Sequence, residues 1–198
     1  MSDVGIYADL LADGFKDDPA VIIQLKGIPD GFKLLQLQSK GQIEAFSKLG
    51  CVKTYGDGEG VLIGYSTKDV PRDKLIQCSY ESAIYVLEYA TQEELMLIQQ
   101  NASKVEKITK EDWYKKYLGD VDVYILQMMV VREDLRGSGV FGKLISSVLK
   151  KYQQENMPVV LQTHNIDNVA KYEHYGFELM ETIYSEELNL KCFNMLKK

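Results

Sequence analysis

The chain has 198 residues, enough for one ordinary domain or for one domain with an elaborated arm. Its apolar fraction of 45% is sufficient to build a core, and its charged fraction of 26% is typical of a globular surface in water. The formal net charge is −6 and no dense run of lysine and arginine occurs, which disfavours a nucleic-acid partner, whereas the acidic excess suits either solubility or a cationic amine substrate.

The first part of the chain, residues 1–118, is predicted to be rich in helix. It begins with acidic residues and no basic region, which argues against a signal or transit peptide. Apolar residues at helical spacing predict helices over 4–15 and 32–49, and Gly50 ends the second of them.

A β-hairpin is predicted to interrupt these helices. The segment CVKTYGDGEGVLIGY (51–65) predicts two strands that turn through 56–58. The pattern is helical again over 71–103, and Thr109 is predicted to cap a short helix that ends at Leu118.

From residue 119 onward, strands and helices alternate. Residues 121–131 (VDVYILQMMVV) are almost continuously apolar, which predicts a central strand covered on both faces. An amphipathic helix follows, and it should form the right-handed crossover to a parallel strand. Its apolar stripe consists of Val140, Phe141, Leu144, Ile145, Val148, Leu149 and Tyr152.

The last part of the chain is predicted to add three strands and one helix. Pro158 opens a buried strand, VVLQT, and a short helix over 167–175 is ended by Gly176. Two final strands are expected at 177–184 and 188–196.

The three cysteines are widely separated and fit neither a zinc site nor a disulfide framework. No apolar run is long enough to cross a bilayer. We therefore expect a cytoplasmic protein with no metal and no membrane partner. The cysteines are Cys51, Cys78 and Cys192.

The stretch RGSGVFGKL (136–144) fits three phosphate-binding patterns at once: GxGxxG, GxxxxGK, and nearly RxxGx[GA]. The P-loop pattern fails because Leu144 stands where a hydroxyl should bind Mg²⁺, and because five residues separate the loop from its strand. The dinucleotide pattern fails because no acidic residue ends a strand about 20 residues further on, and too little chain follows for a full sheet.

The third pattern is supported by more than the loop. From Val131, the sequence VREDLRGSGVFGKLI resembles the signature of the GNAT superfamily of N-acetyltransferases. Downstream, NIDNVAKYEHYGFEL (165–179) resembles the second signature of that family. The residues in register with it are Asn165, Tyr172, Glu173, Gly176 and Phe177.

The resemblance implies an α+β fold with a mixed, mostly antiparallel sheet, whose central parallel strands splay apart and whose faces are flanked by helices. We expect a single domain, 1–198, in which 119–198 form the acyl-CoA-binding core and 1–118 lie on the acceptor side. The first strand of the family is not evident before the helix at 4–15, so the sheet is expected to start at the hairpin. A homodimer is left open.

The implied activity is transfer of an acetyl group from acetyl-CoA to a primary amine of a small molecule or peptide. The alternative is a non-catalytic acyl-CoA-binding domain with a regulatory role. Three parts of the chain are expected to form the acceptor pocket: the amino-terminal helices at 4–15 and 32–49, which we call the helical arm, the hairpin loop, and residues 66–72. None of them carries an informative motif.

The glycine-rich loop would hold the pyrophosphate of the coenzyme. Glycines let consecutive N–H groups line one concave spot, and the first turn of a helix adds free N–H groups and a positive dipole end. Arg136 would add its charge, and Phe141, where the family has Gly or Ala, still supplies an N–H group. The alternative is a tight turn whose glycines serve backbone geometry only. The loop residues assigned to binding are Arg136, Gly137, Ser138, Gly139, Val140, Phe141 and Gly142.

The pantetheine arm would lie between the strands that end at Val131 and near Thr163. Main-chain groups of Met129 and Val131 would pair with its amides, and Asn165 would hydrogen-bond the coenzyme. Core packing for Met129 and Val131, and a helix-cap role for Asn165, are the alternatives.

For catalysis, the resemblance supplies a candidate acid, Tyr172, for which aromatic packing is the alternative. The usual carboxylate on the central strand is absent, because residues 123–131 contain no acidic residue and offer only Gln127 as an uncharged amide side chain. The candidate bases are then Asp122, Glu81 and His164, acting directly or through water. His164 follows a buried strand at the end where α/β sites open, although a capping or solvated histidine is equally consistent with its position.

Overall fold

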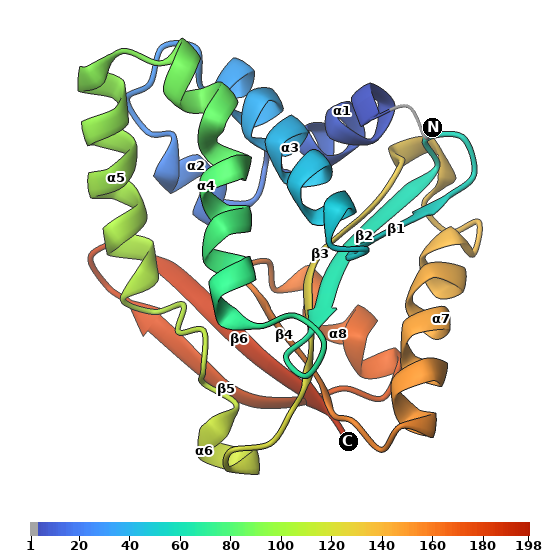
Figure 1. The fold of residues 1–198 in the computed structure, drawn as a ribbon. Coiled ribbons are helices and arrows are strands. Elements are labelled where there is room, and N and C mark those ends of the chain that lie inside the picture. Colours follow the sequence, from blue (N-terminus) through green and yellow to red (C-terminus); the bar gives the residue numbers. More distant parts are fainter. Residues whose placement is uncertain (1–3) are drawn as a thin grey trace.

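The structure is a computed structural model that describes residues 4–198. Its centre is a six-stranded sheet with the order β1-β2-β3-β4-β6-β5, and helices cover both faces (Figure 1). The amino-terminal helices lie on one side of the sheet, whereas α7 and α8 lie on the other. Along residues 4–198, none of the helices combines the length and the apolarity that crossing a membrane requires.

The first part of the chain is rich in helix, as predicted. Its elements are α1 Val4–Phe15, α2 Pro19–Gln24, α3 Gly31–Lys48, β1 Val52–Tyr55, β2 Gly60–Ser66, α4 Arg72–Tyr89, α5 Gln92–Glu106 and α6 Lys115–Leu118. The sheet of the described residues starts at the hairpin β1–β2, which confirms the expectation that no strand precedes it.

The second part alternates strands and helices, as predicted. Its elements are β3 Tyr124–Val131, the 3₁₀ turn Glu133–Leu135, α7 Val140–Gln154, β4 Val159–Thr163, α8 Asp167–His174, β5 Glu178–Ser185 and β6 Leu190–Lys197. Only β3 and β4 are parallel, and all other neighbouring strands are antiparallel. The predicted α+β fold with a mixed, mostly antiparallel sheet is therefore confirmed.

Three predictions of local structure were wrong or incomplete. Helix α2 was missed; it begins at Pro19, and the Asp18 carboxylate caps it by accepting from the N–H groups of Ala20 and Val21. The helix predicted over 71–103 is broken into α4 and α5, because Thr91 forms a capping box with Glu94.

Thr109 does not cap the short helix before β3. Its hydroxyl lies 2.9 Å from Nε2 of His164, and regular helix begins only at Lys115. A tertiary hydrogen bond to a residue far along the chain has replaced the local cap.

Two hydrophobic clusters fix the helices on the two faces of the sheet. The α7 side is filled by the apolar stripe of that helix, with Ile145 and Val148 fully buried, and by the stacked rings of Tyr124 and Tyr152 at 4.3 Å. On the other side, α1 and α3 pack on β2 and β3. All three cysteines are buried and carry free thiols.

Helices α3 and α4 pack closely at Gly41, where a Cβ atom would collide with the backbone of Ser82. The Gly41→Ala variant gains helix propensity but must push the two helices apart. We expect a net loss of about 1–3 kcal/mol in the free energy of unfolding, measured by urea denaturation. Ser47→Ala, an exposed change on the same helix, is the matched control and should cost nothing measurable. An unchanged unfolding midpoint for Gly41→Ala would contradict the close approach.

Candidate functional site

The glycine-rich loop presents a set of free backbone donors. Gly137 and Gly139 have φ values of 84° and 90°, a left-handed conformation that favours glycine, and Gly139 is the N-cap of α7. Within residues 4–198, five backbone N–H groups of the loop and first helical turn donate to no acceptor. They belong to Gly137, Gly139, Val140, Phe141 and Gly142.

Ser138 uses both of its hydrogen-bond donors inside the turn. Its N–H and its hydroxyl both donate to the carbonyl of Leu135, at 3.1 and 2.6 Å. A Cβ atom at Gly137 or Gly139 would meet nothing within 4 Å, so the space over the loop is open. The loop therefore combines free donors with open space at Gly137 and Gly139, which is what a bound anionic group requires.

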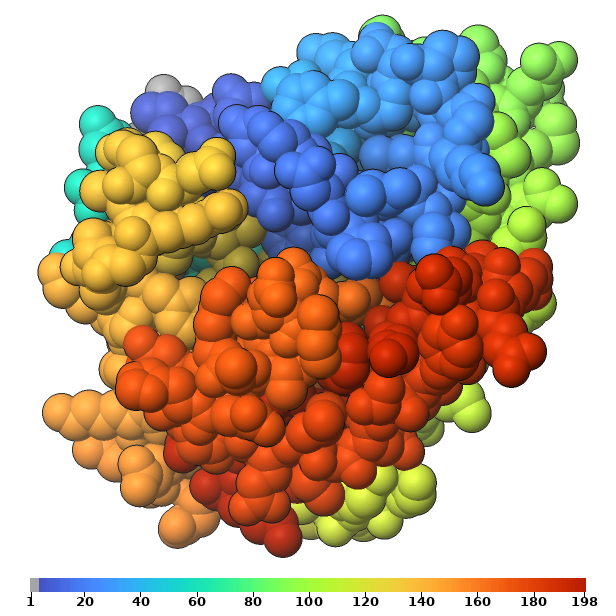
Figure 2. Space-filling model, turned by 180° about the vertical axis from the view of Figure 1, so that it is seen from behind, coloured from blue at the N-terminus to red at the C-terminus, as the bar shows by residue number. Residues whose placement is uncertain are grey.

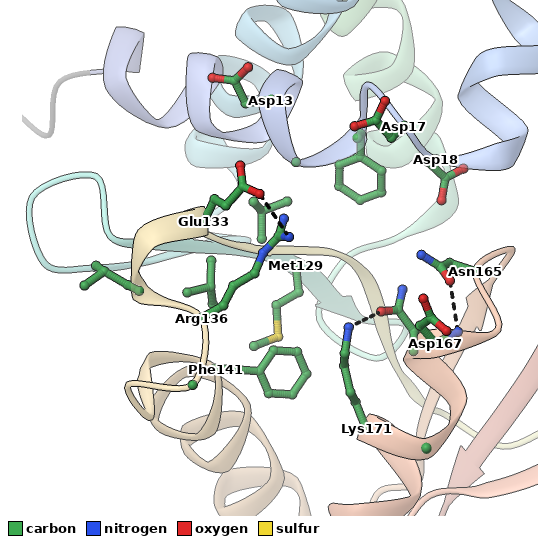
Figure 3. Close-up of a pocket in the computed structure, with 18 of the residues that line it drawn as sticks. Asp13, Asp17, Asp18, Met129, Glu133, Arg136, Phe141, Asn165, Asp167 and Lys171 are labelled. Carbon is green, nitrogen blue, oxygen red and sulfur yellow. Dashed lines mark hydrogen bonds and ion pairs between the residues drawn. The ribbon is translucent and has the colours of Figure 1, made fainter.

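A first cavity of about 800 Å³ opens beside this loop (Figure 3). Its walls come from four segments: the end of α1 with 16–18, the end of β3 with the loop, the first turn of α7, and α8 with Asn165. In the space-filling view, the blue, yellow and orange segments that supply these walls meet on one face of the molecule (Figure 2).

Charges of both signs line the first cavity. Arg136 lies at its edge with a 63% exposed side chain, 3.7 Å from the Glu133 carboxylate, and Lys171 donates to Asn168 at 3.1 Å. Asn165 also lines this cavity, and its side-chain oxygen accepts from the N–H group of Asp167 at 2.9 Å. Within residues 4–198, no three His, Cys, Asp or Glu side chains gather in an arrangement that could hold a metal ion.

The central strands separate beside the first cavity. Parallel pairing between β3 and β4 is limited to Tyr124 with Val159 and Ile125 with Val160. Beyond these pairs the strands part, although β3 continues to Val131. We call the resulting opening the β3–β4 gap.

A bulge in β3 turns the main-chain groups of Met129 and Val131 toward this gap. Before the bulge, Tyr124 faces β4, since its N–H group donates to Pro158. The register with β2 then skips Gln127. This extra residue reverses which residues of β3 point their main-chain groups toward β2 and which toward β4. After the bulge, Arg132 faces β2, because its N–H group donates to the carbonyl of Glu59 at 2.9 Å. Residues 129 and 131 must therefore face the gap, where β4 no longer pairs with them.

A second cavity of about 410 Å³ lies on the other side of the gap, against the helical arm. The residues that line both cavities are Phe15, Asp18, Met129 and Asn168. The two cavities therefore meet at the β3–β4 gap.

Tyr172 lines the second cavity and is 7% exposed. Its ring packs against Phe141 and Phe177, with centroids 5.8 and 5.6 Å away. Its hydroxyl has no hydrogen-bond partner within residues 4–198. Burial raises the pKa of this phenol well above its ordinary value. Tyr172 thus packs through its ring while its hydroxyl stays available to the cavity.

His164 also lines the second cavity, at the carboxyl end of β4. Its Nε2 lies 2.9 Å from the Thr109 hydroxyl, which fixes the ring. Burial lowers the pKa of the imidazole below 6.5, while the charge of Asp18 works in the opposite direction. The neutral form is therefore favoured near pH 7.

The other candidate bases lie elsewhere. The Glu81 carboxylate binds Lys48 at 2.7 Å and lines neither cavity, and Asp122 accepts from Thr67 at 2.9 Å and likewise lines neither. The hairpin loop and residues 66–72, which were expected in the acceptor pocket, also line neither cavity. The exposed His174, on α8, lines the first cavity.

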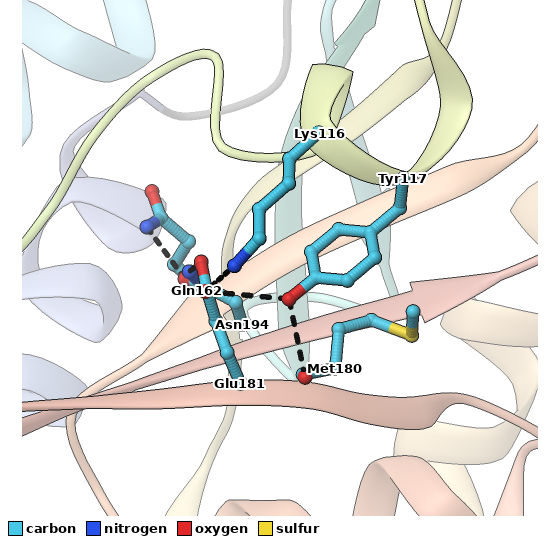
Figure 4. A network of polar contacts seen from close by, with 6 residues as sticks. All are labelled: Lys116, Tyr117, Gln162, Met180, Glu181 and Asn194. Carbon is cyan, nitrogen blue, oxygen red and sulfur yellow. Dashed lines mark hydrogen bonds and ion pairs between the residues drawn. The ribbon is translucent and has the colours of Figure 1, made fainter.

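A polar network that runs from the exposed Lys116 to the buried Asn194 positions Gln162 in one wall of the second cavity (Figure 4). Gln162 donates its side-chain N–H to the fully buried Asn194 at 2.7 Å, and Asn194 donates to Glu181 at 2.8 Å. Lys116, 3.0 Å from Glu181, lowers the pKa of that carboxyl. The amide oxygen of Gln162 is left without a partner within residues 4–198.

Sequence reasoning missed several residues of the second cavity. Asp18, Ser39 and Glu111 belong to three separate segments with no motif, and only the fold brings them together. The one sequence signal was the N-cap pattern Asp18-Pro19, which marks a helix start rather than a site.

Comparisons with known proteins agree with this architecture. No family model matches the sequence. An uncharacterized N-acetyltransferase of Schizosaccharomyces pombe is 29% identical over 94 residues, which are 46% of this chain and 34% of that protein. The chain thus matches only about a third of the length of this curated relative.

Solved structures match over nearly the whole chain. A Corynebacterium glutamicum structure of histone acetyltransferase HPA2 and related acetyltransferase has a TM-score of 0.62 at 16% identity, covering 100% of this chain and 91% of that one. An N-acetyltransferase of Staphylococcus aureus Mu50 has a TM-score of 0.59 at 18% identity, covering 98% and 95%. Arylalkylamine N-acetyltransferase 2 of Aedes aegypti has a TM-score of 0.58 at 15% identity, covering 100% and 95%. The chain has the fold of GNAT acetyltransferases, which confirms the predicted resemblance.

The lowered pKa of His164 can be tested directly. The His174→Gln variant leaves His164 as the only histidine, so that its ring signal can be followed by NMR against pH. We expect a pKa below 6.5, because burial disfavours the imidazolium. The contribution of neutral His164 to the free energy of unfolding is complete above pH 6.5. It declines as the pH falls below that value, because the unfolded chain then binds a proton on this histidine more readily than the folded chain does. A pKa at or above 6.5 would show that the Asp18 charge outweighs burial.

Proposed function

We propose that this chain is an acetyl-CoA-dependent N-acetyltransferase that acts on a primary amine. The observation that carries the proposal is the meeting of the two cavities at the β3–β4 gap, with five free N–H groups in the loop beside the first, of which those of Gly137 and Phe141 belong to residues that line it. One cavity can hold a pyrophosphate-bearing molecule, and the other can hold a second substrate. Transfer between two bound molecules requires such a junction.

The residues of the first cavity fit coenzyme A. The free N–H groups of the loop and the positive end of α7 would bind the pyrophosphate, and Arg136 would add a charge at the edge. The main-chain groups of Met129 and Val131 would pair with the amides of the pantetheine arm, as an added strand pairs with a sheet edge. Asn165, at the opposite wall, would contact the same arm.

Bound acetyl-CoA would supply a thioester at the junction of the cavities. The transfer forms a bond from the acceptor nitrogen to the acetyl carbon and breaks the carbon–sulfur bond. His164, held by Thr109, would accept the proton that the amine loses, through a water molecule or directly. Tyr172 would give a proton to the departing sulfur. An N–H group of the β3 edge would donate to the carbonyl oxygen as it gains charge.

The alternative function is acyl-CoA binding without transfer. A non-catalytic domain has no need for a second cavity with free polar groups, and that cavity favours the enzyme. Incubation with acetyl-CoA and a panel of amines, followed by measurement of free thiol and of coenzyme binding, separates the two functions. Coenzyme binding without thiol release on any amine would support the alternative.

The Gly139→Glu variant tests whether the glycine-rich loop binds the pyrophosphate. A carboxylate beside the pyrophosphate should weaken coenzyme A binding at least about tenfold, measured by calorimetry, because like charges then face each other. Gly119→Glu is the matched control, since Gly119 also has a positive φ and open space around it but lies outside the glycine-rich loop. The control should lose at least as much stability as Gly139→Glu, because Gly119 has φ 74° and ψ −153°, a conformation that essentially only glycine adopts, whereas Gly139 is in the left-handed region. Equal affinities for the two variants would remove the loop from the site.

The Tyr172→Phe variant tests the acid. It keeps the packed ring and removes only the hydroxyl, so the fold should be preserved. We expect kcat to fall about 10²-fold or more. KM for acetyl-CoA should change little, because the glycine-rich loop is unaltered. Full kcat in this variant, with chemistry shown to limit the rate, would leave Tyr172 with packing alone.

A further inference from the structure

The second cavity contains carboxylates and no cationic side chain. Among the described residues that line it, there is no lysine or arginine, while Asp18 and Glu111 contribute carboxylates. Glu111 forms no ion pair within residues 4–198. The cavity therefore opposes an anionic group and favours a cationic one.

Its polar side chains also have unused hydrogen-bonding capacity. Ser39 is 1% exposed, lines the cavity, and its hydroxyl has no partner within residues 4–198. Because every fully occluded side-chain polar atom has a partner, the small exposed surface of Ser39 must include this hydroxyl. Gln38 and Gln42, on the same helix, line the cavity and have side chains without partners in the described chain. A buried polar group without a partner is costly unless a ligand or water satisfies it.

The two carboxylates occupy different parts of the site. Asp18 lines both cavities and so stands at their junction, where its Oδ1 caps α2 at 2.9 Å from the Ala20 N–H and its Oδ2 has no partner among the described residues. Glu111 lines only the second cavity. A ligand that fills this cavity from the junction inward therefore meets one carboxylate near its reacting end and another elsewhere along its length.

We propose that the acceptor is a small aliphatic amine that carries a second cationic group rich in N–H donors, an ammonium or a guanidinium. This inference rests on the proposed function and assigns the second cavity as the acceptor site. Asp18 attracts the reacting ammonium before it loses its proton, Glu111 binds the second cation, and the amide oxygens and Ser39 accept the remaining N–H bonds. Amino acids and other acceptors that bear a carboxylate are disfavoured, because no cation of the cavity pairs with them.

A matched series of amines tests the second charge. The acceptors are butylamine and 1,4-diaminobutane, octylamine and 1,8-diaminooctane, 4-guanidinobutylamine, 4-aminobutanoate and 2-phenylethylamine. With the unaltered protein and acetyl-CoA, at least one dication should exceed its monocation of equal length in kcat/KM by at least about tenfold, as expected for a hydrogen bond to a charged group. The aminobutanoate should be the poorest acceptor. Preference for a monocation, for the aromatic amine or for the aminobutanoate would overturn the inference.

Three variants locate the effect. Glu111→Gln should reduce the preference for the dication about tenfold. Asp18→Asn keeps an oxygen that can cap α2 and should raise KM for all amines. Glu88→Gln removes an exposed carboxylate that lines neither cavity, and it should change neither quantity. An unchanged preference in Glu111→Gln, with the protein folded by circular dichroism, would contradict the assignment of the second cation to Glu111.

Calorimetry of the same amines without acetyl-CoA separates this inference from the proposed function. Tighter binding of the dications, reduced in Glu111→Gln but not in Glu88→Gln, supports the inference even if no thiol is released on any amine, and in that case only the proposed transfer fails. Thiol release on amines without preference for a second cation would uphold the transfer and overturn the inference. Absence of both dication binding and dication turnover would also overturn it.

Discussion

The separation of β3 from β4 is the constraint on which the rest of this molecule depends. A parallel pair that stayed in register would satisfy all of its main-chain groups internally and leave no opening in the sheet. Here two residue pairs hold the strands together, and the bulge at Gln127 reverses the side on which the later β3 groups lie. The main-chain groups of Met129 and Val131 are thereby left facing a gap. Both cavities meet at that gap.

The two cavities are built by different physical means. The first depends on backbone groups, because glycines in left-handed conformations and the start of α7 expose N–H donors that no side chain needs to supply. The second depends on side chains from the helical arm, the 109–113 segment and the strands. Backbone donors suit a phosphate group that is the same in every reaction of a coenzyme, whereas side chains allow the selection of one acceptor.

The interior of the second cavity also shows how distant polar contacts set a site. A series of polar contacts from Lys116 through Glu181 and Asn194 fixes the side-chain amide of Gln162. The Thr109 hydroxyl fixes the ring of His164. These contacts join α6 and the segment before it to β4, β5 and β6. The burial that lowers the pKa of His164 and raises that of Tyr172 follows from the same packing. The buried phenol of Tyr172 is therefore less acidic than an ordinary phenol.

The sequence by itself determined the elements of the second half of the chain, because the apolar run at 121–131, the stripe of α7 and the glycine loop are local patterns with a fixed period or geometry. It also determined the five loop residues whose N–H groups are free, since their exposure follows from the helix start. Only the tertiary structure decided the second cavity. Ser39 and Glu111 carry no local pattern, and the pattern at Asp18 marks only a helix start. Thr109 exchanged its expected cap for a bond to His164, and Glu81 and Asp122 fell outside both cavities. Contacts between residues far apart in the chain depend on how whole helices pack, and no short stretch of sequence contains that information.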